Sequence, residues 1–305
     1  MSKKYVSPFD FIYPLNLNGL NGRFLYLPSR MKNNKSNVLI VYDFNSNIEM
    51  YFGLAVYLSK RSNVTVVDLP GFGGMDSMYK IRKIPSINNI SDYLASFIKL
   101  RYKNKRLNLL TFGFGSVLAV RCIQNNDSLF KKINNYIFIN GYSHHDDFDI
   151  SSRRKKYRYL LNRIKATSLV SFIIKSTIYS RSFLDYRINK NSEVRKLSNG
   201  FSYLKQFLVD LNRENDLRTK YYLQAQVLKL DNCNNHISGK CWFVNVGSKS
   251  KGLIPRRIEQ HFKIIFSTFA SVNVKGVRKI PLIMNDEKIA AKIIPIKIRN
   301  ILRKS

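Results

Sequence analysis

Acidic residues are scarce in this chain, which has 19 Asp and Glu against 52 Lys and Arg and a formal net charge of +33. A field of this sign attracts nucleic acids, anionic membrane surfaces and acidic proteins. The basic residues are nevertheless spread along the chain, with short clusters at 103–106, 153–158 and 297–304. Because site-specific nucleic-acid binders gather their charge on one face, this scatter favours solvated basic surfaces and compositional drift over a dedicated polyanion site.

Cysteines and long apolar runs are also few. Cys122, Cys233 and Cys241 lack metal-ligand spacing and do not make an even disulfide framework. No stretch approaches the roughly 18 uninterrupted apolar residues of a membrane-spanning helix. No apolar segment follows Lys3 and Lys4, as a signal peptide would require. We therefore expect a cytoplasmic protein in a reducing compartment, with no transmembrane segment, no bound metal and no cofactor.

What the chain does contain is a regular alternation of strand and helix patterns. Its 305 residues are 45% hydrophobic, enough for one large α/β domain or a core with an insertion. A hairpin is predicted over 9–28. Short apolar runs then predict buried strands at 37–42, 63–67, 107–112 and 136–141, with helices between them. This order predicts a mostly parallel sheet with helices on both faces.

The alternation stops at Tyr142 and resumes near residue 236. Residues 142–235 are largely helical, polar and basic in pattern. We therefore expect a helical cap over 142–235, inserted after the sixth strand, and a core made of 1–141 and 236–305. The elements predicted beyond the cap are a strand at 241–246, a helix at 256–269, a strand at 271–274 and a closing helix at 286–302 interrupted at Pro295.

One stretch organises the rest of the chain. Residues 107–112 predict a buried strand, Gly113 and Gly115 a sharp turn, and the apolar residues after them a helix. This stretch resembles the nucleophile elbow of the α/β-hydrolases, where a Ser, Cys or Asp sits on such a turn. The other stretches that resemble landmarks of lid-bearing members, in the family's order, are Asp68 to Gly73 with Asp76, Val244 to Gly247 with Pro255, and Gly276 to Pro281 with 286–290.

The resemblance implies the α/β-hydrolase fold with a cap, and the activity of an esterase or other acyl hydrolase. At the catalytic positions, however, the nucleophile falls on Gly113, the acid on Ser250 (or Lys251) and the histidine on Lys279. Glycine cannot attack an ester, and lysine is mostly protonated unless strongly desolvated. We expect a retained fold with lost hydrolysis. The resemblance places the ligand pocket at Tyr42, Asp43, Phe112, Gly113, Phe114 and Lys279.

Other residues could replace the missing groups. Ser116 lies one turn into the elbow helix, where packing or capping is its ordinary role. His144, His145, Asp146 and Asp147 follow a strand at the edge where ligands approach open α/β sheets. Cys122 is expected on the buried face of the elbow helix, and His236 and His261 are expected to be structural or solvated. Asp43, at the mouth of the pocket, could form an ion pair with Lys279.

Three functions follow from these observations. The first is a non-catalytic hydrolase-fold protein that binds a small, partly apolar ligand or serves as an interaction scaffold. The second is an active ester or thioester hydrolase with relocated groups, using Ser116, His144 and Asp146. The third is a basic module that binds an acidic protein or another polyanion, although no specific nucleic-acid motif is present.

Overall fold

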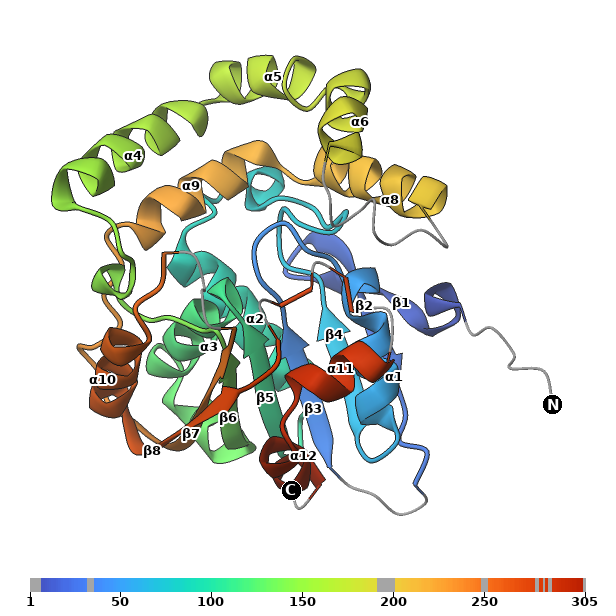
Figure 1. Cartoon of the computed structure of the whole chain (residues 1–305), viewed down its shortest axis with the longest axis vertical. Coiled ribbons are helices and arrows are strands. Elements are labelled where there is room, and N and C mark those ends of the chain that lie inside the picture. The colour runs from blue at the N-terminus through green and yellow to red at the C-terminus, as the bar shows by residue number, and fades with distance from the viewer. Residues whose placement is uncertain are drawn as a thin grey trace.

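A single eight-stranded sheet forms the centre of the computed structural model (Figure 1). The structure describes residues 7–31, 36–190, 201–247, 252–277, 280–281, 283–284 and 287–303, without the side chains of 201–204. The strands are β1 (Ile12–Leu17), β2 (Leu20–Leu27), β3 (Asn37–Val41), β4 (Asn63–Val67), β5 (Leu107–Phe112), β6 (Ile133–Ile139), β7 (Ile237–Val246) and β8 (Phe266–Val274). The sheet order is β1-β2-β4-β3-β5-β6-β7-β8.

The sheet is mostly parallel, as the sequence predicts. β3 pairs in parallel with both β4 and β5, and β5, β6, β7 and β8 continue the parallel arrangement. The predicted hairpin supplies the antiparallel pairs, β1 with β2 and β2 with β4. Every residue of β3 and of β5 is buried, which is why these segments are apolar nearly throughout.

Helices surround the sheet, and the connections between parallel strands carry most of them. Five short 3-10 helices lie in the loops that the structure describes, at Pro8–Phe11, Glu49–Tyr51, Met78–Ile81, Asp127–Lys132 and His145–Asp147. The described α-helices are α1 (Phe52–Ser59), α2 (Ile87–Arg101), α3 (Phe114–Gln124), α4 (Ser152–Lys165), α5 (Ser168–Ser176), α6 (Arg181–Asn189), α8 (Phe201–Glu214), α9 (Leu217–Val227), α10 (Pro255–Ile265), α11 (Glu287–Ile293) and α12 (Ile296–Arg303). None of these helices is both long and apolar enough to cross a membrane, over the residues that the structure describes.

The predicted boundaries near the C-terminal strands were partly wrong. The helix predicted over 256–269 ends at Ile265, and β8 begins at Phe266. The cause lies in the apolar spacing, because Phe262, Phe266 and Phe269 recur at helical intervals. Phe266 leaves the helix because its ring packs against Tyr136 at 5.0 Å, on the sheet. β7 also begins earlier than predicted, at Ile237.

Helices α4 to α9 lie between β6 and β7, so the predicted helical insertion after the sixth strand is confirmed. In Figure 1 these helices arch over one end of the sheet. The carbonyl of Gly71 accepts a 2.9 Å hydrogen bond from the backbone N–H of Asp216, and Asn215 Oδ1 accepts one of 3.0 Å from the N–H of Gly73. The glycine loop after β4 thus holds the start of α9 over the carboxyl ends of the strands. The division into core and cap domains at 142 and 235 stays a prediction.

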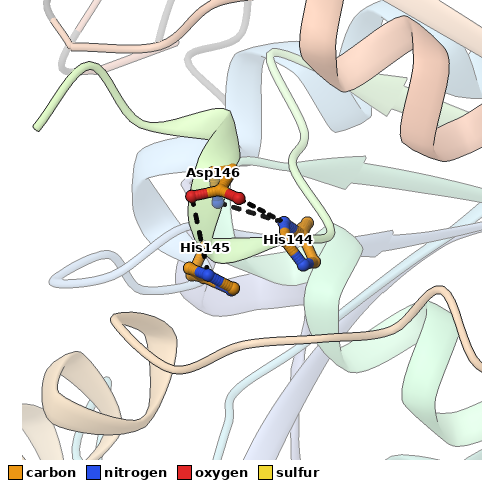
Figure 2. Close-up of side chains that lie close together, drawn as sticks. All are labelled: His144, His145 and Asp146. Carbon is orange, nitrogen blue, oxygen red and sulfur yellow. Dashed lines mark hydrogen bonds and ion pairs between the residues drawn. The ribbon is translucent and has the colours of Figure 1, made fainter. Parts of the chain in front are cut away.

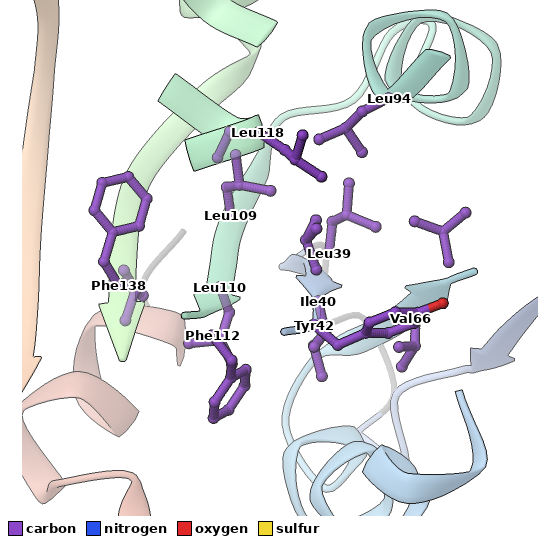
Figure 3. Close-up of a cluster of buried hydrophobic side chains, with 14 of the residues drawn as sticks. Leu39, Ile40, Tyr42, Val66, Leu94, Leu109, Leu110, Phe112, Leu118 and Phe138 are labelled. Carbon is purple, nitrogen blue, oxygen red and sulfur yellow. The ribbon is translucent and has the colours of Figure 1, made fainter. Parts of the chain in front are cut away.

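The core lies between the sheet and its helices. Figure 3 shows that Leu109 of β5 points toward Leu94 of α2 and Leu118 of α3, whereas Leu110 points to the other side of the sheet. All four side chains are fully buried. This alternation between two buried faces explains why β5 has no polar face and fixes the strand that leads into the turn at Gly113.

Candidate functional site

The turn after β5 has the geometry of a nucleophile elbow. β5 ends at Phe112 and α3 begins at Phe114, so Gly113 alone makes the turn, with φ 46° and ψ −114°. A residue with a Cβ is strained at such angles, whereas glycine is not. A Cβ on Gly115 would collide with the carbonyl oxygen of Val41, so α3 packs closely on β3. The predicted strand, turn and helix are present, and the apex carries no side chain.

The carboxylate of Asp43 lies against this turn. Its Oδ1 accepts a hydrogen bond from the backbone N–H of Phe44 and another from that of Phe114, each 2.8 Å long. In the hydrolases that the elbow resembles, the oxyanion hole consists of the N–H after the nucleophile and an N–H from the loop after the third strand. Phe114 follows the nucleophile position, and Phe44 lies on the loop after β3. The Asp43 carboxylate therefore lies where the resemblance places an oxyanion.

The same carboxylate also takes the space of a nucleophile. A Cβ built on Gly113 would overlap the Cγ and both carboxylate oxygens of Asp43. Desolvation of the Asp43 carboxylate raises its pKa, and the hydrogen bonds from Phe114 and Phe44 partly counter that rise. A serine at position 113 would require the Asp43 side chain, which accepts both hydrogen bonds, to move. The empty apex and the filled hole are thus parts of one arrangement.

Tyr42 lies inside the core at the base of this site. Its hydroxyl donates to Asp68 Oδ1 at 2.7 Å and accepts from the backbone N–H of Leu69 at 3.0 Å. Asp68 Oδ2 accepts from Arg23 Nε at 2.7 Å. Burial raises the pKa of Asp68 to about 7, against the lowering effect of Arg23. Sequence reasoning missed this network, because its three side chains come from β2 and from the ends of β3 and β4.

The two phenylalanines beside Gly113 are also buried. Phe112 is 1% exposed and Phe114 is fully buried. The ring of Phe114 stacks on Phe44 with centroids 4.0 Å apart, and Phe112 lies 5.0 Å from Tyr51. These contacts close the apolar base of the elbow. The role of Tyr42, Phe112 and Phe114 as the lining of a ligand pocket stays a prediction.

Ser116 connects the elbow to the next strand. Its hydroxyl lies 2.7 Å from the carbonyl of Gly113 and 2.8 Å from the carbonyl of Tyr142, and it accepts the N–H of Tyr142 at 2.8 Å. The side chain is fully buried. This arrangement uses the hydroxyl to hold the chain after β6 against the turn. Cys122, further along α3, is fully buried as expected, and burial raises the pKa of its thiol.

The two other positions of the expected triad lie outside the described residues. These positions are Ser250, with Lys251 as its alternative, and Lys279. The predicted ion pair between Asp43 and Lys279 therefore stays a prediction. What the structure adds is that the Asp43 carboxylate already has two backbone donors.

A second polar cluster follows β6, in the segment that leads into the cap. The side chain of Asp147 is fully buried, and its Oδ2 accepts the N–H of Ser143 at 2.8 Å and that of His144 at 2.9 Å. The other oxygen, Oδ1, lies 2.6 Å from Nδ1 of His261 on α10. The ring of His144 lies between those of His145 and His261, with centroids 4.1 Å and 4.4 Å away.

The pair of His261 and Asp147 has the form of the histidine and acid in a catalytic triad, with Nδ1 directed at a buried carboxylate. The expectation that His261 is simply structural or solvated did not include this partner. Sequence reasoning could not find it, because 114 positions separate the two residues and one histidine on a helix carries no signal for its partner. Among described hydroxyls, that of Ser116 is already engaged at the elbow.

A metal ion is the other group that such a cluster could hold. One ligand atom each from His144, His145 and Asp146 lie within 4.8 Å of one another (Figure 2). In the structure, however, Nδ1 of His144 accepts the backbone N–H of Asp146 at 3.1 Å, and Asp146 Oδ1 is paired with Lys155 Nζ at 2.7 Å. A cation bound through these two atoms would have to displace Lys155 and break the hydrogen bond from the N–H of Asp146. The arrangement therefore fits the hydrogen-bonded N-terminus of the 3-10 helix at His145–Asp147 better than a metal centre.

Comparisons with known proteins identify the architecture. No protein-family model matches the chain, and no curated protein matches it in sequence. Solved structures do match at low identity. A putative epoxide hydrolase from Pseudomonas aeruginosa is 12% identical with a TM-score of 0.66, and the match covers 91% of this chain and 92% of that one.

Two other solved structures give the same result. The enol-lactonase from Burkholderia xenovorans has a TM-score of 0.61 at 13% identity, covering 87% of this chain and 92% of its own. A thermophilic esterase from Thermogutta terrifontis has a TM-score of 0.58 at 14% identity, covering 96% of each chain. The three differ in reaction and agree in architecture. The chain has the α/β-hydrolase fold, as its sequence resemblance implied.

Proposed function

We propose that this protein is a non-hydrolytic member of the α/β-hydrolase superfamily, in which the elbow has become a closed structural element. The observation that carries the proposal is the position of Asp43. Its Oδ1 accepts both N–H groups that would form the oxyanion hole, each at 2.8 Å. Gly113, at the nucleophile position, has no group that can be acylated.

Two separate obstacles to hydrolysis support this proposal. Covalent catalysis requires a nucleophile, and a glycine at the apex supplies none. Acyl transfer also requires donors directed at the place where negative charge develops. A carboxylate already bound to those donors blocks the carbonyl oxygen of a substrate and opposes the new charge electrostatically. Restoring the nucleophile alone would therefore leave the second obstacle in place.

We propose that the protein binds instead of hydrolysing: it holds a small ligand beneath the cap, or the cap itself contacts a partner. The chain has the helical insertion, and hydrogen bonds tie it to the loops of the core, among them Asp216 to Gly71, Asn215 to Gly73, Asp216 Oδ2 to the Ser77 hydroxyl at 2.6 Å, and Gln226 to the N–H of Ile87 at 2.7 Å. We propose a small, partly apolar ligand as the occupant, bound on the cap side of the buried rings of Phe112 and Phe114.

The alternative is an active ester or thioester hydrolase with relocated groups. One observation favours it over a uniformly inert fold, namely the imidazole of His261 held by the buried carboxylate of Asp147. In that version His261 would be the base, in place of the predicted pair of His144 and Asp146. Ser116 is the weaker half of this alternative, since its hydroxyl is fully buried and bonded to the backbone.

The deciding experiment combines a fluorophosphonate probe, read by intact mass, with turnover of short-chain p-nitrophenyl esters. We expect no adduct and no saturable turnover from the unaltered protein. A single serine adduct, with turnover lost in Ser116→Ala or His261→Asn, would contradict the proposal and support the relocated enzyme.

Matched variants then test the role of Asp43. The pair Gly113→Ser, Lys279→His restores two catalytic residue types but leaves the carboxylate in the hole, so we expect it to remain unlabelled. Adding Asp43→Gly to the same pair frees the two N–H donors and the space around position 113. We expect labelling to appear only in this triple variant. Equal labelling with and without Asp43 would show that the carboxylate does not close the site.

A further inference from the structure

The cap has an outer face on which large apolar side chains are exposed. This outer cap face consists of exposed residues on α4 and α5. On α5, Leu169 is 71% exposed, Phe172 is 68% exposed and Ile173 is 50% exposed. On α4, Tyr157, Leu160 and Ile164 are 68%, 60% and 48% exposed. Six large apolar side chains exposed on two consecutive helices exceed the scattered single exposures that need no explanation, and such gathering is typical of an interaction surface.

These side chains form stripes rather than isolated positions. On α4, successive members of the set are three and four residues apart. On α5, Phe172 and Ile173 follow Leu169 by three and four residues, so each set lies on one face of its helix. The other side of α5 is covered, since Ser171 and Ile174 are buried. In Figure 1, α4 and α5 form the outermost layer of the molecule, and α9 lies between α4 and the sheet. The apolar stripes therefore face away from the core.

Positive charge accompanies the apolar stripes. Between residues 151 and 190 the chain has eleven Lys and Arg residues and one acidic residue, Asp185. Asp185 is itself paired with Lys205 at 3.5 Å. The side chains of Arg154, Lys156 and Arg158 are exposed on α4, beside its apolar stripe. The face thus combines an apolar strip with a cationic border.

The apolar strip and its cationic border together favour one class of partner over the others that a basic protein attracts. A second copy would bring an equally positive face against this one, and like charges oppose that contact. A nucleic acid would satisfy the charges but would leave Leu169, Phe172 and Ile173 in water. An anionic bilayer surface satisfies both, because apolar side chains enter the boundary below the headgroups while Lys and Arg contact lipid phosphates.

We propose that the outer cap face docks onto an anionic lipid membrane, with α4 and α5 lying along its surface. Leu169, Phe172 and Leu160 would enter the interface, and Arg154, Lys156 and Arg158 would bind the headgroups. This inference goes beyond the proposed function and does not depend on it, because docking uses the side of the cap that faces away from the elbow. It gives the protein a place at a membrane without a transmembrane helix.

The test is flotation of the full chain with vesicles of equimolar phosphatidylglycerol and phosphatidylcholine, compared with vesicles of phosphatidylcholine alone. We expect binding to the anionic vesicles and little binding to the neutral ones. Leu169→Ser with Phe172→Ser should weaken binding at least tenfold, whereas Ile264→Ser with Ile296→Ser, which removes exposed side chains outside the cap, should leave it unchanged. Circular dichroism and thermal unfolding show whether each variant is folded.

A matched pair of charge variants separates docking from general electrostatics. Arg154→Gln, Lys156→Gln, Arg158→Gln removes three charges from the outer cap face. Lys103→Gln, Lys105→Gln, Arg106→Gln removes three exposed charges from the loop before β5, at the opposite end of the strands. Each Lys or Arg near an anionic surface raises the affinity for that surface roughly fivefold, so we expect the triple variant on the outer cap face to weaken vesicle binding roughly 100-fold. The loop triple should have a much smaller effect.

Several results would overturn the proposal. Absence of vesicle binding would do so, as would equal loss of binding in the two charge triples or no effect of Leu169→Ser with Phe172→Ser. A change of oligomeric state in the cap variants, with vesicle binding intact, would assign the face to contacts between copies. Binding of polyglutamate but not of vesicles, lost in the same cap variants, would assign it to an acidic protein.

Discussion

At the scale of single residues, Gly113 and Asp43 belong together. The angles at Gly113 favour glycine, and the volume beside it is filled by the Asp43 carboxylate. Either feature alone could be an isolated departure from the enzyme pattern. Together they give the turn its own internal contacts, since the N–H groups of Phe44 and Phe114 are satisfied within the chain. The elbow is thereby stable without a ligand.

The first residue-scale prediction concerns the stability of this arrangement. Asp43→Ala leaves the N–H groups of Phe44 and Phe114 without their acceptor, so we expect the free energy of unfolding to fall by about 2 kcal/mol. Asp43→Asn keeps an oxygen at the same place and should cost clearly less. Urea unfolding followed by circular dichroism measures both. If the alanine variant were as stable as the asparagine variant, the two hydrogen bonds would not hold the turn.

The pKa of Asp43 gives the same comparison a pH dependence. Desolvation raises this pKa above the ordinary value of 3.8, so the folded protein binds a proton more readily than the unfolded chain. The stabilisation that comes from protonating Asp43 in the folded protein is fully present below pH 3.8, and it is lost as the pH rises through the raised pKa. Asp43→Asn removes the ionisable group, and its stability should therefore decline less than that of the unaltered protein over this range.

The sequence identified half of this site. Gly113 could be placed at the apex because strand, glycine turn and helix are local patterns with known periods. Asp43 could be placed at the mouth of the site by its position after β3. Its two backbone donors could not be predicted, because the rotation of one side chain decides whether it faces Phe114 or solvent. The hydrogen bond between Tyr42 and Asp68 could not be predicted from the sequence for the same reason.

At the scale of elements, the strands of the core could be predicted well. Buried parallel strands are apolar on both faces, so β3, β4 and β5 are visible as short apolar runs. The boundary between α10 and β8 at Phe266 could not be predicted, because a buried aromatic residue at this position fits the helical spacing before it and the strand pattern after it. The cap was visible only as a region without strands, and its contacts with the glycine loop after β4 depend on side chains far apart in sequence.

The 3-10 helix at His145–Asp147 is another element that sequence alone understates. Asp147 joins it to α10 through His261, and Ser116 joins the chain before it to the elbow through Tyr142. A continuous set of hydrogen bonds therefore links α3, the start of the cap and α10. The ring of His144 is partly buried between two other imidazoles, a position that no local sequence pattern indicates.

This element carries the second prediction, a pH dependence. Desolvation and the neighbouring His145 and His261 lower the pKa of His144, while Asp231 and Asp146 raise it to a smaller degree. The unfolded chain, with the ordinary pKa of 6.5, therefore binds this proton more readily than the folded protein. The free energy of unfolding should fall as the pH is lowered through 6.5 toward the folded pKa.

His144→Asn tests this dependence, because an asparagine oxygen can still accept the N–H of Asp146 in an Asx turn. We expect the variant to lose less stability than the unaltered protein between pH 7.5 and pH 5, an interval of about one unit or more on either side of an ordinary histidine pKa. His236→Asn, on the loop before β7, is the matched control and should keep the original slope. Identical slopes for all three proteins would remove His144 as the source.

At the scale of the whole molecule, the large positive charge has few partners. The net charge of +33 leaves most of the 52 Lys and Arg residues without an acidic residue to pair with. Cations instead lie over aromatic rings on the cap, as Arg163 does over Tyr222 at 4.9 Å and Lys229 over Tyr159 at 3.9 Å. Self-repulsion opposes the compact state, and the buried core must overcome it.

The last prediction follows from this repulsion. Raising sodium chloride from about 0.01 M to about 0.15 M shortens the Debye length from roughly 30 Å to roughly 8 Å, which screens charges spread over a whole surface. We expect the Tm to rise by a few degrees, since 1 kcal/mol corresponds to roughly 2–4 °C in a chain of about this size. Sucrose at matched osmolality controls for solvent effects. The Lys103→Gln, Lys105→Gln, Arg106→Gln variant should respond less to salt, because it removes three repelling charges. A Tm that falls with salt would mean that ion pairs outweigh repulsion, and the excess of positive charge would then be no burden on the fold.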